Sequence, residues 1–350
     1  MGWNLNDLTV TTGAPTAAAQ PTGYVFDTHG TQHVTYLGTD GHIHELLWDP
    51  TGWHHRDLTS ATSSPQGLNT AIGYVFLDTQ HVIFFGAGVD QLWRDSHGWH
   101  YENILGASGA TGIGATGRPI GYAFIAQRTQ HVNFPDVLGN VQELWWDSPS
   151  GWHQNSLTAA AGAPKTSANP TGYVFDAQGT QHVNYVGVDS HVYELWWDTA
   201  GWHYNDLTAA TGAPLAQANR DAVGYMFPSQ GSQHVNYIGT DNHIHELWWD
   251  SHGWHHHDLT TATGAPNASG SPFGFMFAGT QQVVFRGVDN HIHELSWDTG
   301  GWHDNDLTVA TGAAPTSFAD PTGYAFNAYG SQHVIYGADN GHVLELYWTP

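Results

Sequence analysis

Short stretches of alternating hydrophobic and polar residues recur along this chain, always four in the same order. One copy reads TGYVF at 171–175, TQHVNY at 180–185, HVYELWW at 191–197 and GWHYNDL at 201–207. Each stretch is rich in aromatic and β-branched residues and is bounded by Gly, Asp, Asn or Pro, which is typical of short β-strands separated by turns. We therefore predict a four-stranded antiparallel meander in every copy.

Gly-Trp pairs mark seven copies of this unit. Their tryptophans are Trp3, Trp53, Trp99, Trp152, Trp202, Trp254 and Trp302. The repeat of about 50 residues is that of a propeller blade, and the segment TATGAP is expected to cross from the outer strand of one blade to the inner strand of the next. The predicted fold is all-β: a seven-bladed β-propeller of four-stranded antiparallel blades, forming a single domain over residues 1–350.

The two ends of the chain hold complementary fragments of a blade. The stretch GWNLNDLT at the start is a fourth strand without its partners, and the last copy stops at HVLELYWTP without a fourth strand. We expect residues 1–10 to complete the blade formed by 323–350. The ring would then close and leave no exposed sheet edge at the seam.

The loop between the second and third strands decides which side chains share a face. Several copies place Gly or Asn third in a three-residue segment, where a positive φ is required. These segments are Thr39-Asp40-Gly41, Thr240-Asp241-Asn242 and Val288-Asp289-Asn290. Because strand side chains alternate with period two, such a loop puts His182, Asn184, Glu194 and Trp196 on one face. Val183, Tyr185, Leu195 and Trp197 then lie on the other.

A histidine and a glutamate twelve positions apart therefore share the polar face of five blades. The pairs are His33 with Glu45, His131 with Glu143, His182 with Glu194, His234 with Glu246 and His333 with Glu345. Four of these glutamates are followed two positions later by an aromatic residue, namely Trp145, Trp196, Trp248 and Tyr347. Two blades depart from the pattern and are expected to be impaired as sites. One has Gln282 and Ser296; the other has Gln91 and Arg94.

A carboxylate, a neighbouring donor and an aromatic face together suit a monosaccharide, whose hydroxyls and C-H surface they complement. Each contact contributes about 1 kcal/mol or a little more, so a single site of this kind is weak. Repetition around a ring compensates, because linked sites on a glycan-coated surface gain avidity without new contacts. The sequence thus predicts repeated sugar-binding pockets at or between blades, with no cofactor and no metal.

Composition excludes several other partners. The formal net charge is −24 with only 7 Lys and Arg, which disfavours nucleic acid and anionic membrane surfaces. No apolar run reaches the roughly 20 residues that span a bilayer, and MGWNLNDLTV lacks the features of a signal peptide, so we expect a soluble chain of open cellular location and open oligomeric state. Cysteine is absent, which removes disulfides, thiolate nucleophiles and Cys-type zinc sites.

These residues resemble propeller lectins, both the six-bladed fungal and bacterial fucose-binding lectins and the seven-bladed bacterial lectins. The most specific part is the segment from QHV through DxHIHELWWD to GWH, because fucose-binding lectins carry a basic residue and a glutamate at the same separation before a tryptophan-rich end. The resemblance implies a non-catalytic glycan-binding protein. This chain has histidine where those lectins have arginine, and Thr35, Asn133, Asn184 and Asn236 where their stacking aromatic lies, so it does not specify fucose.

Other interpretations stay open. The repeated His, Asn and Glu could form a hydrogen-bonded network that aligns the blades. The pairs His42/His44, His243/His245 and His291/His293 could bind a metal, although Tyr193, Gln142 and Leu344 occupy the second position elsewhere. A protein-binding scaffold is the rival function from another class. Catalysis is not expected, because an enzyme concentrates perturbed groups at one asymmetric site; Arg94, Arg118, Arg128 and Arg220, each unique to one blade, indicate drift or local specificity instead.

Overall fold

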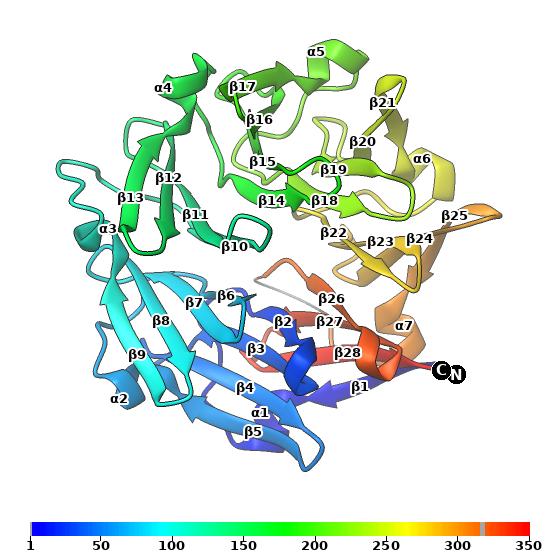
Figure 1. Ribbon diagram of the computed structural model, residues 1–350. Coiled ribbons are helices and arrows are strands. Elements are labelled where there is room, and N and C mark those ends of the chain that lie inside the picture. The colour runs from blue at the N-terminus through cyan, green and yellow to red at the C-terminus, as the bar shows by residue number, and fades with distance from the viewer. Residues whose placement is uncertain (1, 316–318) are drawn as a thin grey trace.

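Seven four-stranded sheets are arranged around a ring in the computed structural model, which describes residues 2–315 and 319–350 (Figure 1). Every sheet is antiparallel, and its strands follow one another from the centre of the ring outward. The chain is therefore a seven-bladed β-propeller, as the repeats predict. We number the blades in chain order, from blade 1 (β2 to β5) to blade 7 (β26 to β28 with β1).

The first strands of the blades contact one another around the centre of the ring (Figure 1). They are β2 (Thr22–Phe26), β6 (Ile72–Phe76), β10 (Ile120–Phe124), β14 (Thr171–Phe175), β18 (Val223–Phe227), β22 (Phe273–Phe277) and β26 (Thr322–Phe326). The second strands are β3 (Thr31–Leu37), β7 (Thr79–Phe85), β11 (Thr129–Pro135), β15 (Thr180–Val186), β19 (Ser232–Ile238), β23 (Thr280–Arg286) and β27 (Ser331–Gly337).

The third and fourth strands complete the blades toward the rim. The third strands are β4 (Ile43–Asp49), β8 (Val89–Asp95), β12 (Val141–Asp147), β16 (Val192–Asp198), β20 (Ile244–Asp250), β24 (Ile292–Asp298) and β28 (Val343–Thr349). The fourth strands are β5 (Gly52–Asp57), β9 (Gly98–Asn103), β13 (Gly151–Ser156), β17 (Gly201–Asp206), β21 (Gly253–Asp258), β25 (Gly301–Asp306) and β1 (Gly2–Asp7).

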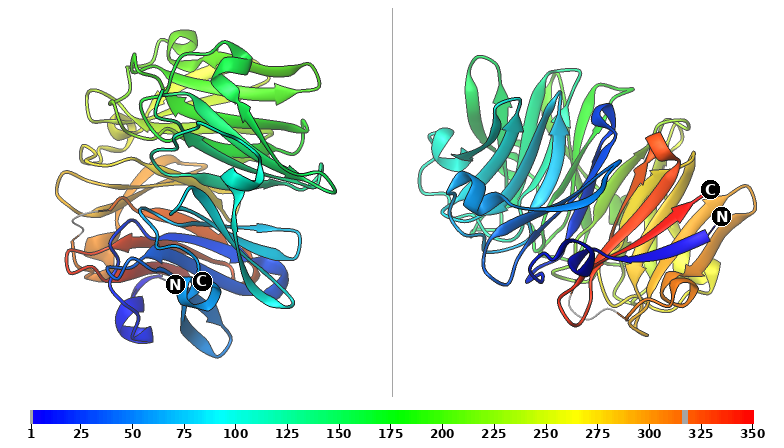
Figure 2. Two further views of the ribbon diagram at one scale, coloured as in Figure 1. Left: turned by 90° about the vertical axis from the view of Figure 1, so that its left-hand side faces the viewer. Right: turned by 90° about the horizontal axis from the view of Figure 1, so that it is seen from below.

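The ring closes by pairing the two ends of the chain. Strand β1 lies antiparallel to β28, with Trp3 opposite Trp348 and Asn6 opposite Glu345. Figure 2 shows the two termini side by side in blade 7. This confirms the predicted seam, and it leaves neither β1 nor β28 as an unpaired strand at the junction.

Each crossing between blades opens with a single helical turn that the sequence pattern does not predict. These helices are α1 (Leu8–Thr12), α2 (Leu58–Thr62), α3 (Ile104–Ala107), α4 (Leu157–Ala161), α5 (Leu207–Thr211), α6 (Leu259–Thr263) and α7 (Leu307–Thr311). Two 3-10 turns, η1 (Asp27–His29) and η2 (Asn327–Tyr329), follow β2 and β26. Four or five residues are too few to show helical periodicity. Within the described residues no helix is long and apolar enough to cross a membrane.

Six hairpin loops have the predicted three-residue form, whereas the loop of blade 2 is two residues shorter, with Gly86 N donating to Gly88 O at 3.3 Å. In blade 4, Gly187 N donates to His191 O at 2.8 Å, and Ser190, third in the loop, has a φ of 67°. Asn242 and Asn290 occupy the same position with φ of 68° and 65°. The resulting register sets Asn184 opposite Glu194, which confirms that the polar side chains of β15 and β16 share one face.

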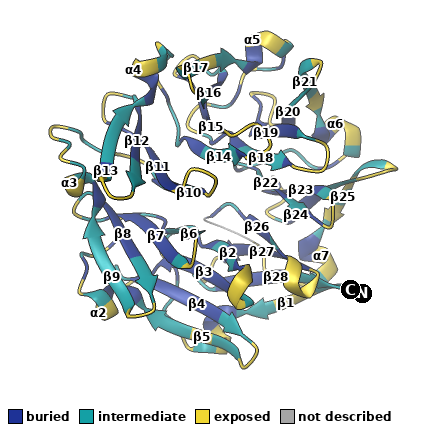
Figure 3. Cartoon of the chain, in the orientation of Figure 1, coloured by how far each residue is buried: buried dark blue, intermediate teal, exposed yellow. Residues whose placement is uncertain are grey.

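The core lies between blades, where the face carrying the His and Glu of one blade packs against the apolar face of the next. Val186 and Val192 of blade 4, for example, cluster with Val235, Tyr237 and Leu247 of blade 5, and all five are almost fully buried. Burial of each such side chain stabilises the fold by about 1.5–3 kcal/mol. Figure 3 shows the buried residues on the strands and the exposed ones on the helices and loop tips.

The recurring Gly-Tyr of the first strand is explained by this packing. Tyr173 of blade 4 lies against Gly224 of blade 5, where a Cβ would stand 2.3 Å from the tyrosine ring. The same contact joins Tyr122 to Gly172 and Tyr225 to Gly274. Glycine is therefore needed for close approach of neighbouring first strands, and the tyrosine ring fills the space that the missing Cβ leaves.

Candidate functional site

The five His and Glu pairs meet in the structure. The distance from His Nδ1 to Glu Oε1 is 2.8 Å in blades 1, 4, 5 and 7 and 2.9 Å in blade 3. All ten side chains are at least 95% buried. The predicted parity is thus confirmed, and the two groups bind each other.

The remaining polar atoms of the pair also have partners inside the blade. In blade 4, Thr180 Oγ1 lies 2.8 Å from His182 Nε2, and Asn205 Nδ2 donates to Glu194 Oε2 at 2.8 Å. Tyr173 covers one face of His182, with ring centroids 5.3 Å apart. Since the carboxylate accepts the Nδ1 proton, a neutral ring accepts the hydroxyl proton at Nε2.

A glutamine from the next blade extends this network across the interface. Tyr173 Oη of blade 4 donates to Gln233 Oε1 of blade 5 at 2.8 Å. Between blades 5 and 6, Gln281 Nε2 lies 2.7 Å from His234 Nδ1 and 3.0 Å from Glu246 Oε1. The repeated polar residues therefore connect the blades, which is what the network interpretation requires.

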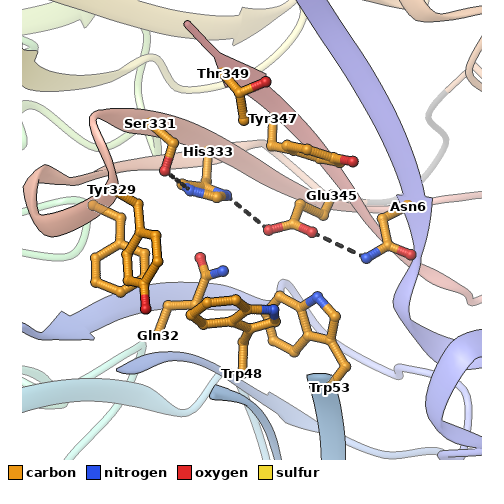
Figure 4. A pocket seen from close by; sticks show the side chains of 11 residues that line it. Asn6, Gln32, Trp48, Trp53, Tyr329, Ser331, His333, Glu345, Tyr347 and Thr349 are labelled. Carbon is orange, nitrogen blue, oxygen red and sulfur yellow. Dashed lines mark hydrogen bonds and ion pairs between the residues drawn. The ribbon is translucent and has the colours of Figure 1, made fainter. Parts of the chain in front are cut away.

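Two of the five pairs, those of blades 7 and 3, nevertheless form part of the wall of open cavities between blades. Between blades 7 and 1 a cavity of about 300 Å³ is lined by His333, Glu345 and Tyr347 on one side and by Trp48 and Trp53 on the other. Figure 4 shows the chain of hydrogen bonds from Ser331 through His333 and Glu345 to Asn6, facing the two indoles. The site combines a polar wall with an aromatic one.

Two further cavities have the same construction. The one between blades 3 and 4 measures about 320 Å³ and is lined by His131, Glu143 and Trp145 with Trp197 and Trp202. The one between blades 2 and 3 measures about 280 Å³. His81, Gln91, Trp93, Glu102, Trp146 and Trp152 are among its lining residues. The volumes lie near the lower end of the range for small-molecule sites.

Three of the aromatic candidates have one face already covered. Trp145 stacks on His153, Trp196 on His203 and Trp248 on His255, with ring centroids 4.0–4.2 Å apart. Trp145 also lines a cavity, so a ligand there would meet part of a ring that His153 supports from behind.

Sequence reasoning missed the tryptophans that the following blade contributes. The second tryptophan of the third strand and the Gly-Trp tryptophan of the fourth strand both line cavities: Trp48 with Trp53, Trp146 with Trp152, and Trp197 with Trp202. They point away from their own blade's His and Glu, and so they face those of the preceding blade. They could have been found by taking the space between two blades, rather than one face of one blade, as the site.

The two departures expected in blade 2 belong to different interfaces. Gln91 faces blade 3 and accepts from His81 Nδ1 at 3.1 Å. Arg94 replaces a second tryptophan and so faces blade 1, where its Nη1 donates to Gln80 Oε1 at 3.3 Å. In that interface Arg56 also bonds Glu45, at 3.2 Å. The cavity beside Gln91 keeps its aromatic wall.

Blade 6 lacks the histidine, and the pKa of its buried glutamate, Glu294, is raised. Gln282 bonds Thr280 instead, which leaves Glu294 Oε1 buried without a hydrogen-bond partner. Burial raises the pKa of Glu294 to about 7, although Asn305 partly opposes the shift. In blade 1, burial likewise tends to raise the pKa of Glu45, but His33 and Arg56 outweigh it and hold the pKa below its usual value.

The His-x-His pairs carry hydrogen bonds of their own, and the second histidine of each pair is buried. Asp289, His291, His293 and Asp306 in blade 6, like Asp241, His243 and Asp258 in blade 5, are close enough to hold an ion. His291 Nδ1 donates to Asp306 Oδ2 at 2.7 Å, and Asp306 also accepts from Val309 N at the start of α7. The same arrangement recurs in blades 1, 4, 5 and 7, so these side chains anchor the helices to the blades.

Comparison with known proteins supports the architecture. No protein-family model and no curated protein matches the sequence. Among solved structures, a Burkholderia pseudomallei lectin is similar over 95% of this chain and 96% of its own, with a TM-score of 0.71 and 14% identity. The Aleuria aurantia lectin bound to alpha-methyl-L-fucoside covers 83% of this chain and 96% of its own, with a TM-score of 0.55 and 14% identity. AofleA from Arthrobotrys oligospora matches with a TM-score of 0.54 and 14% identity, covering 87% of this chain and 89% of its own.

The chain therefore has the fold of the propeller lectins that its repeats resemble. At 14% identity this likeness concerns architecture.

Proposed function

We propose that the protein is a multivalent, non-catalytic carbohydrate-binding protein whose sites lie between neighbouring blades. The observation that carries the proposal is the recurrence of one cavity type, with a hydrogen-bonded polar wall from one blade and two indoles from the next. Such walls suit a sugar, which offers hydroxyls on its edge and C-H groups on its face. The lectin fold of the structural neighbours supports the same conclusion.

The proposed ligand-binding residues on the polar side are those of the repeated constellation. They are His33, Glu45, His131, Glu143, Trp145, His182, Glu194, Trp196, His234, Glu246, Trp248, His333, Glu345 and Tyr347. His131 with Glu143 and His333 with Glu345 line the two cavities that carry the proposal, and Trp197 and Trp202 illustrate the opposing wall. The partner is a glycan or glycoconjugate, with no cofactor and no metal in the site.

A glycan array followed by calorimetry with the best monosaccharide tests the function. We expect millimolar binding to several equivalent sites and tighter binding to a multivalent surface, because avidity adds to weak single contacts. No response to any sugar at millimolar concentration would favour the rival function, a protein-interaction scaffold in which the His, Asn and Glu repeats only align the blades.

Single substitutions locate the sites. Trp197→Ala removes an aromatic wall and should reduce the number of sugar sites by one. Trp348→Ala is the matched control, because Trp348 is the corresponding residue in the interface where Gln282 and Ser296 replace the pattern. A loss of the same size in both variants would show that the effect is structural.

Glu143→Gln separates a ligand role from a structural one. The His81 and Gln91 pair shows that an amide fits opposite a histidine in this fold. If Glu143 contacts sugar, the variant loses one site while its melting temperature changes little. A sharp fall in melting temperature with sugar binding unchanged would assign the glutamate to the network alone.

A further inference from the structure

The cavity between blades 2 and 3 has a carboxylate in a place that no other blade provides. In five blades the glutamate is on the third strand, buried beneath its histidine. In blade 2 the third strand carries Gln91, and the residue directly opposite it on β9 is Glu102. In blade 3, by contrast, the carboxylate of Glu143 is on the third strand and the amide of Asn155 is opposite it on the fourth strand. The amide and the carboxylate have therefore exchanged strands in blade 2.

This exchange leaves the charge of Glu102 unneutralised. Its one hydrogen bond in the described structure comes from Trp152 Nε1 to Oε2, at 3.2 Å, and no described cation pairs with it. Burial lowers the pKa of His81 to about 4, so the imidazole across the cavity is neutral at physiological pH. The described lining of this cavity includes no lysine or arginine; Arg128 lies on the adjoining cavity beyond Trp146.

Three indoles surround the same space. Trp93, braced by His100 at a centroid distance of 4.2 Å, comes from blade 2, and Trp146 and Trp152 come from blade 3. Trp152 is held by its own bond to Glu102, so the carboxylate and one ring are positioned together. Electron-rich ring faces beside a carboxylate attract an organic cation, and a methylated ammonium loses less hydration on entering such a site than a primary one.

We propose that the cavity formed by Trp93, Trp146, Trp152 and Glu102 binds a methylated or quaternary ammonium group. This inference does not depend on sugar binding by the other cavities. Its volume of about 280 Å³ accommodates such a head group, and the strongly negative chain favours its approach.

Choline and its neutral isostere 3,3-dimethylbutan-1-ol test the proposal on the intact protein. The measurement is the shift of the Trp152 indole N-H resonance, assigned with Trp152→Phe. We expect saturable binding of choline and at least tenfold weaker binding of the isostere. Equal affinity for the two would overturn the proposal, because shape alone would then account for binding. Phosphorylcholine and Nε-trimethyllysine distinguish a lipid or glycan carrier from a peptide carrier of the same group.

A matched pair of variants shows whether the carboxylate of Glu102 contributes to choline binding. Glu102→Gln should weaken choline binding at least tenfold, whereas Glu294→Gln, the same change at a buried glutamate of blade 6 that does not line this cavity, should leave it unchanged. Retention of choline binding in Glu102→Gln would refute the assignment. The comparison of choline with its isostere on the parent protein decides the question even if that variant fails to fold. A choline response without any sugar response would remove the lectin function and keep this one.

Discussion

The buried glutamates of blades 1 and 6 differ in pKa because different residues contact them. In blade 1, the hydrogen bond from His33 and the nearby charge of Arg56 hold the pKa of Glu45 below its usual value despite its burial. Where Gln282 replaces the histidine, the bond from Asn305 only partly offsets the loss of hydration, and burial raises the pKa of Glu294 to about 7. One substitution thus changes a structural carboxylate into a group that titrates near neutrality.

Glu294 should make the ring less stable as the pH rises. Its pKa in the folded protein, about 7, is above its ordinary value of 4.5. Between these values the folded state holds a proton that the unfolded chain has released, so its stabilising effect is complete below pH 4.5 and is lost as the pH rises through 7. Glu294→Gln should therefore increase the free energy of unfolding at pH 8 by up to about 3 kcal/mol and change it little at pH 4.

Urea denaturation at the two pH values measures this difference. Glu345→Gln is the control, because Glu345 already bonds His333 and Asn6 and should gain nothing at pH 8. Gln282→His restores the missing partner and should also abolish the pH dependence due to Glu294. An unchanged stability of Glu294→Gln at pH 8 would show that the buried carboxyl is hydrated or paired in solution.

At the scale of elements, a side chain at the end of the fourth strand caps the helical turn in six of the seven blades. In blade 4, Asp206 accepts from Ala209 N at 2.8 Å and also from His191, which joins α5 to the blade. In blade 5, burial opposes ionisation of Asp258, but bonds from Thr261 and His243 lower its pKa to about 2. Blade 3 lacks this device, since Ser156 provides no cap and its Oγ is buried without a partner.

Ser156→Asp should stabilise blade 3. Aspartate at this position can accept from the backbone N-H two to three residues on, as its counterparts do, and such caps contribute about 1 kcal/mol. The reciprocal variant Asp206→Ser should lose a similar amount. Both values come from denaturant unfolding with unchanged slopes; a destabilising Ser156→Asp would mean that the helical turn of blade 3 cannot adopt the geometry seen in the other blades.

The elements and the parity of their side chains could be predicted from sequence, whereas the completed site could not. Alternation identifies the strands, and residues such as Asn242 and Asn290 identify a three-residue loop by their need for positive φ. The register that puts His182 and Glu194 on one face of the blade follows from those two facts. The role of Trp197 could not be predicted in this way, because it depends on which face of one blade packs against which face of the next. The one-turn helices are likewise too short for a periodic signal.

At the scale of the whole molecule, the ring is closed twice. Backbone pairing of β1 with β28 closes the last blade. Side chains close one end of the central opening, where the residues two positions before the first strands form a circuit: Gln20, Arg118, Asn169, Asp221, Ser271 and Asp320. The sequence shows Arg118 only as a residue unique to its blade, yet it is the one that joins distant blades.

Arg118 should therefore contribute more to stability than other arginines. Its Nη1 donates to Gln20 of blade 1 at 2.6 Å, and its Nη2 pairs with Asp221 of blade 5 at 2.7 Å. One guanidinium of blade 3 therefore connects two blades that are not its neighbours in the ring. Both charged groups are at least 85% buried. Removing one partner leaves the other charge uncompensated, and Arg118→Met should lower the free energy of unfolding by about 3 kcal/mol.

A double-mutant cycle distinguishes this closure from a simple loss of packing. Arg118→Met combined with Asp221→Asn should cost at least about 1 kcal/mol less than the sum of the two single variants, because the second change removes the charge that the first leaves unpaired. Arg128→Met, at an exposed arginine of the same blade, should change stability by no more than about 0.5 kcal/mol. If Arg118→Met is as mild as Arg128→Met, the circuit of side chains does not hold the ring together, and the pairing of β1 with β28 alone closes it.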